Sequence, residues 1–198
     1  MATKYILQSG GVRNYPDKKR KFHQEVVGSL KNPQILICIF AQPREVWEQK
    51  YPNYCQSIKE DLNDDVQPVF TLAKPDRFEQ DCASNDIIYM QGGDDHLIRF
   101  WLEKYDIPKI WSNKIVSGNS GSSYVLAKHF WTNDWRKCMD GLGVLPIKFT
   151  GHFKSNYAKG DPRGPIDYDA IYKELKDYGD KSLPVYALEE GDYIVIEQ

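Results

Sequence analysis

The feature that most constrains the fold is a nearly continuous apolar run at Gln34–Phe40, with the sequence QILICIF. A strand exposed on one face alternates apolar and polar residues, whereas a strand covered by helices on both faces is apolar throughout. Similar short runs recur along the chain, at Lys4–Leu7, Val66–Leu72, Asp86–Met90 and Lys114–Ser117. We therefore expect a largely parallel sheet between two layers of helices.

Segments with helical spacing separate these runs, as expected for successive βαβ units. They are Asp17–Leu30, Arg44–Leu62, Asp94–Tyr105 and Gly121–Phe130. After Phe130 the pattern changes and predicts strands at Val144–Phe149 and Pro184–Leu188, a loop at Asn156–Pro165, a helix at Asp167–Tyr178 and an edge strand at Asp192–Gln198. A chain of 198 residues fits one α/β domain, residues 1–198.

Composition disfavours several classes of partner. The chain has 26 Lys and Arg against 28 Asp and Glu, a net charge of −2, so it lacks the basic excess that attracts nucleic acid or anionic lipid. Its mean hydropathy is −0.60, and no apolar run approaches the roughly 20 residues of a membrane-spanning helix. The apolar run near the start of the chain is shorter than that of a secretory signal. We expect a cytoplasmic protein.

The metal-binding residue types are scattered. The four cysteines are Cys38, Cys55, Cys82 and Cys138, and the four histidines are His23, His96, His129 and His152. No two cysteines form a C-x-x-C pair, and no two histidines have the spacing that places both on one helix face. The sequence therefore predicts reduced thiols, no metal site and no cofactor.

Ser120 lies at the apex of a short turn, Gly118-Asn-Ser-Gly121, that follows the predicted strand Lys114–Ser117. This layout is typical of a nucleophile elbow, whose general pattern is G-x-S-x-G because strand and helix approach closely there. Ser122 stands where the pattern has its second glycine. The alternative is an ordinary turn of small residues that begins a helix.

Two further features follow strands that should end at the same edge of the sheet. His152 comes directly after Val144–Phe149 and could activate Ser120, although a lone histidine there is often only a surface or packing residue. The Gly92-Gly93 pair follows Asp86–Met90 and could expose backbone N–H groups to an oxyanion, or could simply form a turn.

The order of several motifs resembles one family, the aspartyl dipeptidase (dipeptidase E) and cyanophycinase family of serine peptidases. The motifs are Ile88–Gly93, Gly118–Gly121, Thr132–Asp134, Gly141–Pro146, Gly151–Phe153, Gly160–Arg163 and Pro184–Leu188. The resemblance covers most of the chain. It implies a flavodoxin-like three-layer α/β/α sandwich of the class I glutamine-amidotransferase type.

The same resemblance implies catalytic roles for individual residues. Ser120 matches the nucleophile, His152 the general base and Asp134 the acid that orients the histidine. Asp134 is the least secure of the three because Asp140 and Asp161 flank the same strand edge, and because Asp134 could merely cap a helix.

Other positions match the groups that bind substrate. The N–H groups of Gly93 and Gly121 match the oxyanion hole, and Arg163 matches an arginine that binds an acidic first residue of the substrate. Asp94 is a further candidate for binding substrate. It lies in Gly92-Gly93-Asp94-Asp95, where the family usually has a threonine, and so a hydroxyl, at the position of Asp95. A carboxylate here would repel an acidic substrate unless it faces the free amino terminus.

We therefore expect a serine-type dipeptidase that hydrolyses short peptides with an acidic N-terminal residue through an acyl-enzyme. The alternative is a weakly active or inactive relative that binds a small amino-acid-like ligand in the same cleft. A glutaminase-type amidotransferase fits less well, because its nucleophile is a thiol and Cys138 is well removed from Ser120. A short peptide is the expected partner, and the sequence carries no signal for an oligomeric state.

Overall fold

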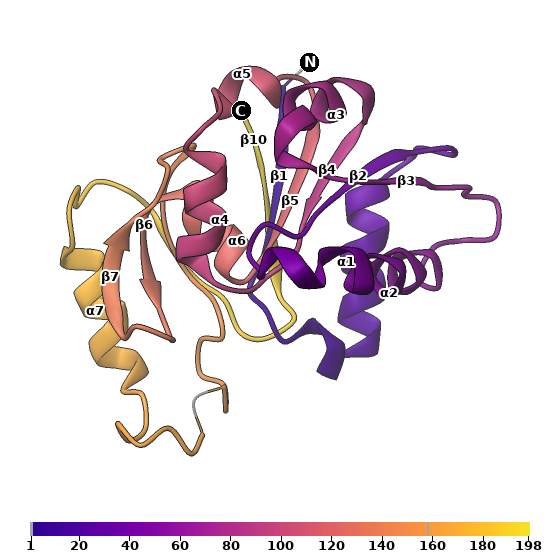
Figure 1. The fold of residues 1–198 in the computed structure, drawn as a ribbon. Helices are drawn as coiled ribbons and strands as arrows, with labels where there is room; N and C mark the ends of the chain where they lie inside the picture. Colours follow the sequence, from indigo (N-terminus) through magenta and orange to yellow (C-terminus); the bar gives the residue numbers. More distant parts are fainter. Residues whose placement is uncertain (1, 158) are drawn as a thin grey trace.

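The computed structural model describes residues 2–157 and 159–198. Its larger sheet has the strand order β10-β1-β5-β4-β2-β3. The strands are β1 (Lys4–Gln8), β2 (Gln34–Cys38), β3 (Val69–Leu72), β4 (Ile87–Met90), β5 (Ile115–Asn119) and β10 (Tyr193–Glu197). β1 to β5 pair in parallel, whereas β10 runs antiparallel to β1 and brings the two ends of the chain side by side (Figure 1).

The strand order explains where the site forms. Read from β3, the order β3-β2-β4-β5 repeats the first four places of the flavodoxin order 2-1-3-4-5, and the chain's first strand takes the fifth place. In sheets of this kind, ligands bind beyond the carboxyl ends of the strands. The loops after β1, β4 and β5 all reach that edge, which is the lower end of the sheet in Figure 1.

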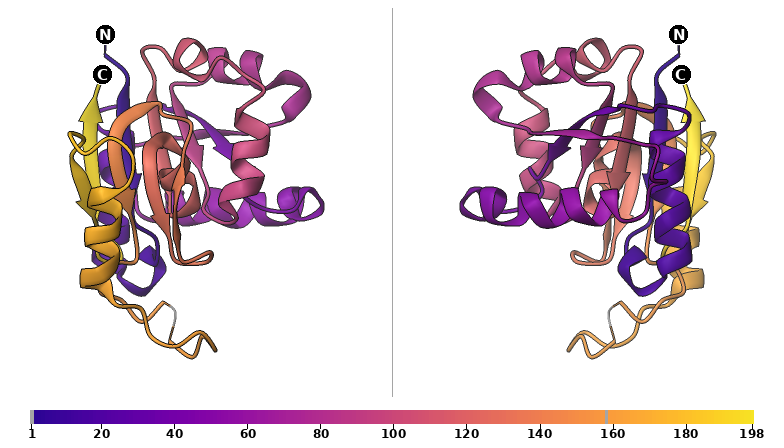
Figure 2. Two further views of the ribbon diagram at one scale, coloured as in Figure 1. Left: turned by 90° about the vertical axis from the view of Figure 1, so that its left-hand side faces the viewer. Right: turned by 90° about the vertical axis from the view of Figure 1, so that its right-hand side faces the viewer.

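Helices cover both faces of this sheet, which confirms the predicted α/β/α architecture (Figure 2). They are α1 (Pro16–Val27), α2 (Trp47–Lys59), α3 (Phe78–Ser84), α4 (Asp95–Leu102), α5 (Ile107–Ile110), α6 (Gly121–Leu126) and α7 (Tyr168–Asp177). Short 3-10 turns at Val12–Asn14, Arg44–Val46 and Pro75–Arg77 precede α1, α2 and α3. Of these helices, none is both long and apolar enough to cross a membrane.

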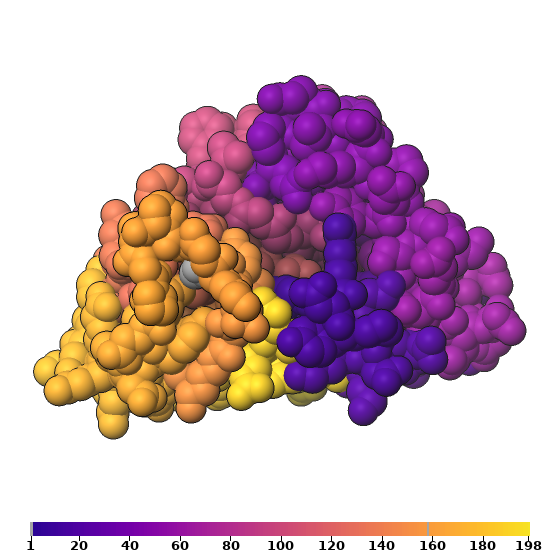
Figure 3. Space-filling view, turned by 90° about the horizontal axis from the view of Figure 1, so that it is seen from below, coloured from indigo at the N-terminus to yellow at the C-terminus, as the bar shows by residue number. Residues whose placement is uncertain are grey.

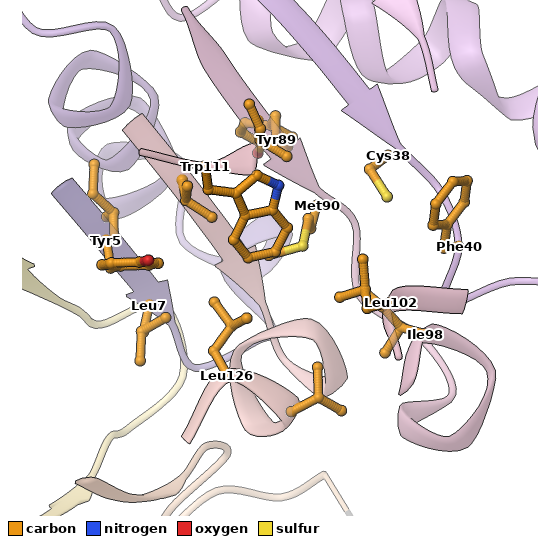
Figure 4. Packing of buried hydrophobic residues seen from close by; sticks show 14 of the residues in the cluster. Tyr5, Leu7, Cys38, Phe40, Tyr89, Met90, Ile98, Leu102, Trp111 and Leu126 are labelled. Carbon is orange, nitrogen blue, oxygen red and sulfur yellow. The ribbon is translucent and has the colours of Figure 1, made fainter. Parts of the chain in front are cut away.

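The core confirms why the second strand is so apolar. Ile35, Leu36, Ile37 and Cys38 are all fully buried, because helices pack on both faces of β2. Large side chains fill the space between sheet and helices, as Figure 4 shows for Trp111 beside Met90 and for Phe40 near Ile98 and Leu102.

The helix predicted at Gly121–Phe130 is wrong in its second half. α6 ends at Leu126, and β6 (Ala127–Thr132) begins a second sheet in the order β7-β6-β8-β9. The other strands are β7 (Lys137–Asp140), β8 (Leu145–Thr150) and β9 (Val185–Ala187). The bulky residues Phe130 and Trp131 suit a pleated strand, and pairing with both β7 and β8 outweighs the helical spacing.

A buried lysine joins the second sheet to α7. Lys148 lies on β8 and is fully buried. Its ammonium donates hydrogen bonds to the carbonyl oxygens of Lys176, at 2.7 Å, and Tyr178, at 2.6 Å. These carbonyls lie at the C-terminal end of α7, where a positive charge is favourable. The ammonium thus stabilises the sheet that carries His152.

Replacing Lys148 with methionine should lower the free energy of unfolding by about 1–3 kcal/mol, because two carbonyls lose a charged donor in a buried place. Urea denaturation measures this loss. Lys173→Met, on the exposed side of α7, is the matched control and should change stability by less than about 0.5 kcal/mol. Equal effects of the two substitutions would contradict a stabilising role for the buried ammonium.

Candidate active site

Ser120 occupies a strained turn between β5 and α6. Its backbone has φ 50° and ψ −120°, a conformation that residues other than glycine rarely adopt. The turn is held by a 2.9 Å hydrogen bond from the Ser120 N–H to the carbonyl of Gln8 on β1. Such a turn raises the serine hydroxyl above the sheet edge, as in a nucleophile elbow.

The residues after Ser120 explain how strand and helix come so close. A Cβ on Gly121 would lie 2.3 Å from the carbonyl oxygen of Gly93, so only glycine fits there. Ser122 replaces the second glycine of the general pattern without a clash. It is fully buried, and its hydroxyl donates a 2.5 Å hydrogen bond to the carbonyl of Gln91.

His152 reaches Ser120 from the second sheet. It follows β8, and its Nε2 lies 3.2 Å from Ser120 Oγ. The ring is buried, and it fits because Gly10 has no side chain: a Cβ there would lie 2.1 Å from His152 Nε2. The structure therefore brings together two residues from separate sheets.

The carboxylate beside His152 is Glu190, which the sequence analysis did not identify. Glu190 Oε1 lies 2.8 Å from His152 Nδ1. The predicted partner Asp134 instead accepts a 3.0 Å hydrogen bond from the Tyr157 hydroxyl. Glu190 lies in the turn between β9 and β10, and β9 pairs with β8, the strand that leads to His152. In the sequence, the acidic pair Glu189-Glu190 directly after the predicted strand Pro184–Leu188 could have indicated this carboxylate.

The two other acids considered from sequence also have different partners. Asp140 Oδ1 lies 2.7 Å from His129 Nδ1, and Asp161 binds the guanidinium of Arg163. Neither forms a hydrogen bond with His152 among the residues that the structure describes. The choice among the candidate acids thus depends on distances that sequence spacing does not encode.

The surroundings of His152 suit a general base. Burial lowers its pKa below the ordinary value of 6.5, while the hydrogen bond to Glu190 and the charges of Glu190 and Asp134 oppose that effect. Burial thus favours the neutral imidazole, the form that can accept a proton. If Nδ1 carries the proton and donates to Glu190, Nε2 is free to accept the proton of Ser120.

The amides of Gly93 and Gly121 lie beside the serine. Both residues line a small enclosed pocket together with Ser120, His152 and Tyr157. Within residues 2–157 and 159–198, neither N–H donates a hydrogen bond to another protein group. Two unused backbone donors next to a serine hydroxyl are the arrangement that stabilises an oxyanion.

Asp94 and Arg163 have structural partners. The Asp94 carboxylate accepts hydrogen bonds from the N–H groups of His96, at 2.8 Å, and Leu97, at 3.1 Å, and so caps α4. Arg163 binds Asp161, and its Nη1 donates to the carbonyl oxygen of Asp134 at 2.9 Å. Asp94 and Arg163 are absent from the lining of both pockets that contain Ser120.

Tyr157 packs against His152. Its ring stacks on His152 with the ring centroids 4.0 Å apart. Beside it, an open cleft of about 620 Å³ reaches Ser120, His152 and Glu190. Seen from the carboxyl ends of the central strands, the molecule is hollowed where the indigo N-terminal segment, the orange segment and the purple segment meet (Figure 3). A short peptide would fit this space.

No group of three or more metal-ligating side chains occurs in the part of the chain that the structure describes. The four cysteines are unpaired. The chemistry available at the site is therefore that of a serine, an imidazole, a carboxylate and backbone amides.

Comparisons with known proteins identify solved structures with a similar fold. No protein-family model and no curated protein matches the chain. A solved structure of a peptidase from an acI-B1 Actinobacterium is 20% identical, with a TM-score of 0.64, over 99% of this chain and 84% of that chain. A protein provisionally described as peptidase E, from Listeria monocytogenes EGD-e, is 12% identical, with a TM-score of 0.66, over 100% of this chain and 95% of that one. The likeness shows a shared fold.

The pKa of His152 can be measured by NMR titration of its ring protons. We expect a midpoint below 6.5, because burial disfavours the charged imidazole. Glu190→Gln should lower the midpoint further, since it removes a negative charge and replaces the carboxylate acceptor with a weaker, neutral amide oxygen. Asp134→Asn should lower it less, because Asp134 acts through its charge alone. A larger shift with Asp134→Asn would contradict Glu190 as the principal partner.

Proposed function

We propose that this protein is a serine-type peptidase that hydrolyses short peptides through an acyl-enzyme. The observation that carries the proposal is the chain of hydrogen-bond contacts from Ser120 to His152 to Glu190, with Ser120 on a strained turn. Two structures with the same fold are described as peptidases, one of them provisionally as a peptidase E, which supports this proposal. We also propose a cytoplasmic location, consistent with four unpaired cysteines.

The first half of the reaction forms the acyl-enzyme. Ser120 Oγ attacks the scissile carbonyl carbon while His152 Nε2 takes the hydroxyl proton. The carbonyl oxygen becomes negatively charged and is stabilised by the N–H groups of Gly93 and Gly121. Glu190 stabilises the imidazolium that forms. When the C–N bond breaks, His152 returns the proton to the leaving amine.

The second half repeats these steps with water. His152 takes a proton from a water molecule that attacks the ester carbonyl of the acyl-enzyme. The tetrahedral intermediate again places its oxyanion near Gly93 and Gly121. The ester bond breaks, the proton returns to Ser120 Oγ, and the acid product leaves. Burial favours the neutral form of His152, which is the form that acts as a base.

The proposed substrates carry an acidic first residue. Arg163 has the position in the sequence that the family resemblance assigns to binding such a side chain. Its guanidinium is about half exposed, is held by Asp161 and lies against the Asp134 backbone. Arg163 contacts Asp134, which lies beside Ser120, so a substrate side chain that extends from Ser120 toward Asp134 would come close to Arg163. The part of the guanidinium that faces solvent could then bind a carboxylate.

Ser120→Ala and His152→Ala should each lower kcat by at least about 1,000-fold, and the double variant should lose little more, because both groups serve one proton-coupled attack. Hydrolysis of Asp-Leu measures the rates. Ser84→Ala, on the exposed side of α3, is the control and should leave kcat unchanged.

A fluorophosphonate probe supplies an independent measurement. It should label the wild-type protein once, at Ser120, and leave Ser120→Ala unmodified, as read by intact mass. A protein that binds small amino-acid-like ligands without catalysis would show neither labelling nor turnover. Additive losses in the double variant would point to another site.

Arg163→Met should lower kcat/KM for Asp-Leu by about 10- to 30-fold, because one charged hydrogen bond to the substrate is lost. The same substitution should change kcat/KM for Ala-Leu by less than about 3-fold. Kinetics with both peptides measure the difference. Equal losses on the two substrates would mean that Arg163 holds its loop rather than binding the substrate, and the proposed acidic preference would be withdrawn.

A further inference from the structure

The open cleft beside Ser120 extends to a positively charged end. At one end it is lined by Ser120 and His152, and at the other by Arg13, Lys50 and Tyr54. The same three distal residues line an adjoining cavity of about 400 Å³, so the two spaces form one continuous groove. In Figure 3 this groove lies between the indigo N-terminal segment and the purple segment that carries α2.

The positive charges at this end are not neutralised by acidic side chains of the described residues that line the groove. Arg13 is exposed, stands 5.8 Å from the Tyr54 ring and forms no ion pair with any described residue. Among the described residues, the Lys50 ammonium donates a hydrogen bond to the amide oxygen of Gln42, which carries no charge, and forms no ion pair. Glu190 is the one acidic residue among those that line the groove in the described structure, and it already binds His152.

The third cation in the region behaves differently. Lys19 lines the adjoining cavity but lies 3.2 Å from the Asp61 carboxylate, which also contacts His23. Its charge is therefore compensated. Arg13 and Lys50 remain as the pair available to an anion. The whole chain has a net charge of −2, so this local excess does not simply reflect a basic protein.

The second space that Ser120 lines carries the reverse charge. This small pocket is lined by Asp95 and Asp134. Asp95 is buried, and its Oδ1 has no hydrogen-bond partner within the described residues. Carboxylates thus line one of the two spaces that contain Ser120, and cations line the other. A dipeptide has the matching polarity, with an ammonium group at one end and a carboxylate at the other.

We infer that Arg13 and Lys50 bind the free C-terminal carboxylate of the residue that leaves during cleavage. The inference rests on the proposed peptidase function and assigns an orientation to its dipeptide substrate, with the carboxylate end in the groove that Arg13 and Lys50 line. A peptide amide lacks this carboxylate and leaves both cations unpaired. The groove thus selects for the charge of the leaving residue.

The test compares Asp-Leu, its C-terminal amide, Asn-Leu and the amide of Asn-Leu. Arg13→Met should lower kcat/KM for both free acids by about 5- to 30-fold, the lower part of the range for a charged hydrogen bond because Arg13 is exposed. Lys50→Met should act in the same direction. Both amides should be poor substrates of the wild type and should lose less than about 2-fold more. Arg20→Met, an exposed arginine of α1 outside the groove, is the matched control.

Three outcomes would overturn the inference. Equal losses on acids and amides would mean that Arg13 and Lys50 support the fold of the cleft. Losses with Asp-Leu and its amide but not with Asn-Leu would show that the cations bind the acidic side chain of the first residue. No loss on any substrate would show that the groove does not bind this part of the peptide.

A binding measurement separates this inference from the proposed function. In Ser120→Ala, calorimetry should give a dissociation constant for Asp-Leu about 5- to 30-fold lower than for its amide, and Arg13→Met combined with Lys50→Met in that background should abolish the difference. If wild-type protein hydrolyses no peptide but this difference is present, the peptidase function fails and the carboxylate subsite stands. If hydrolysis depends on Ser120 and the difference is absent, the subsite fails and the peptidase function stands.

Discussion

The whole site depends on how closely backbone segments approach one another at the carboxyl ends of the strands. Gly121 passes so near the Gly93 carbonyl that a Cβ would lie 2.3 Å from it, and this contact sets two free amides beside Ser120. Gly10 leaves the space that the His152 ring occupies. A side chain at either position would push Ser120 away from the two amides or from His152, so the proposed chemistry depends on these two glycines as well as on the polar groups.

The machinery is divided between two sheets that meet at this edge. Ser120 follows β5 of the central sheet, whereas His152 follows β8 of the second sheet and Glu190 lies in the turn that leads back to the central sheet. A buried imidazole is costly to charge, and Glu190 offsets part of that cost when the ring takes a proton. Lys148 contributes in a different way. Its ammonium joins β8 to α7 and so stabilises the sheet that carries His152.

The two spaces that contain Ser120 differ in charge. Asp95 and Asp134 line the small pocket, whereas Arg13 and Lys50 line the open cleft. Such an arrangement favours one orientation of a zwitterionic substrate and disfavours the reverse, since like charges would then face each other in a partly desolvated space. Positioning of this kind adds to catalysis because it presents the scissile carbonyl to the serine in a single way.

The sequence by itself determined the α/β class and the positions of Ser120 and His152. Continuous apolar runs mark strands buried on both faces, and residues that follow parallel strands must meet at one edge. Only the tertiary structure decided that Ala127–Thr132 is a strand, because pairing with β7 and β8 overrides local spacing. It likewise decided that Glu190, rather than Asp134, contacts His152 and that Arg13 and Lys50 share a groove. These contacts join residues far apart in the chain, and their distances depend on how the two sheets pack.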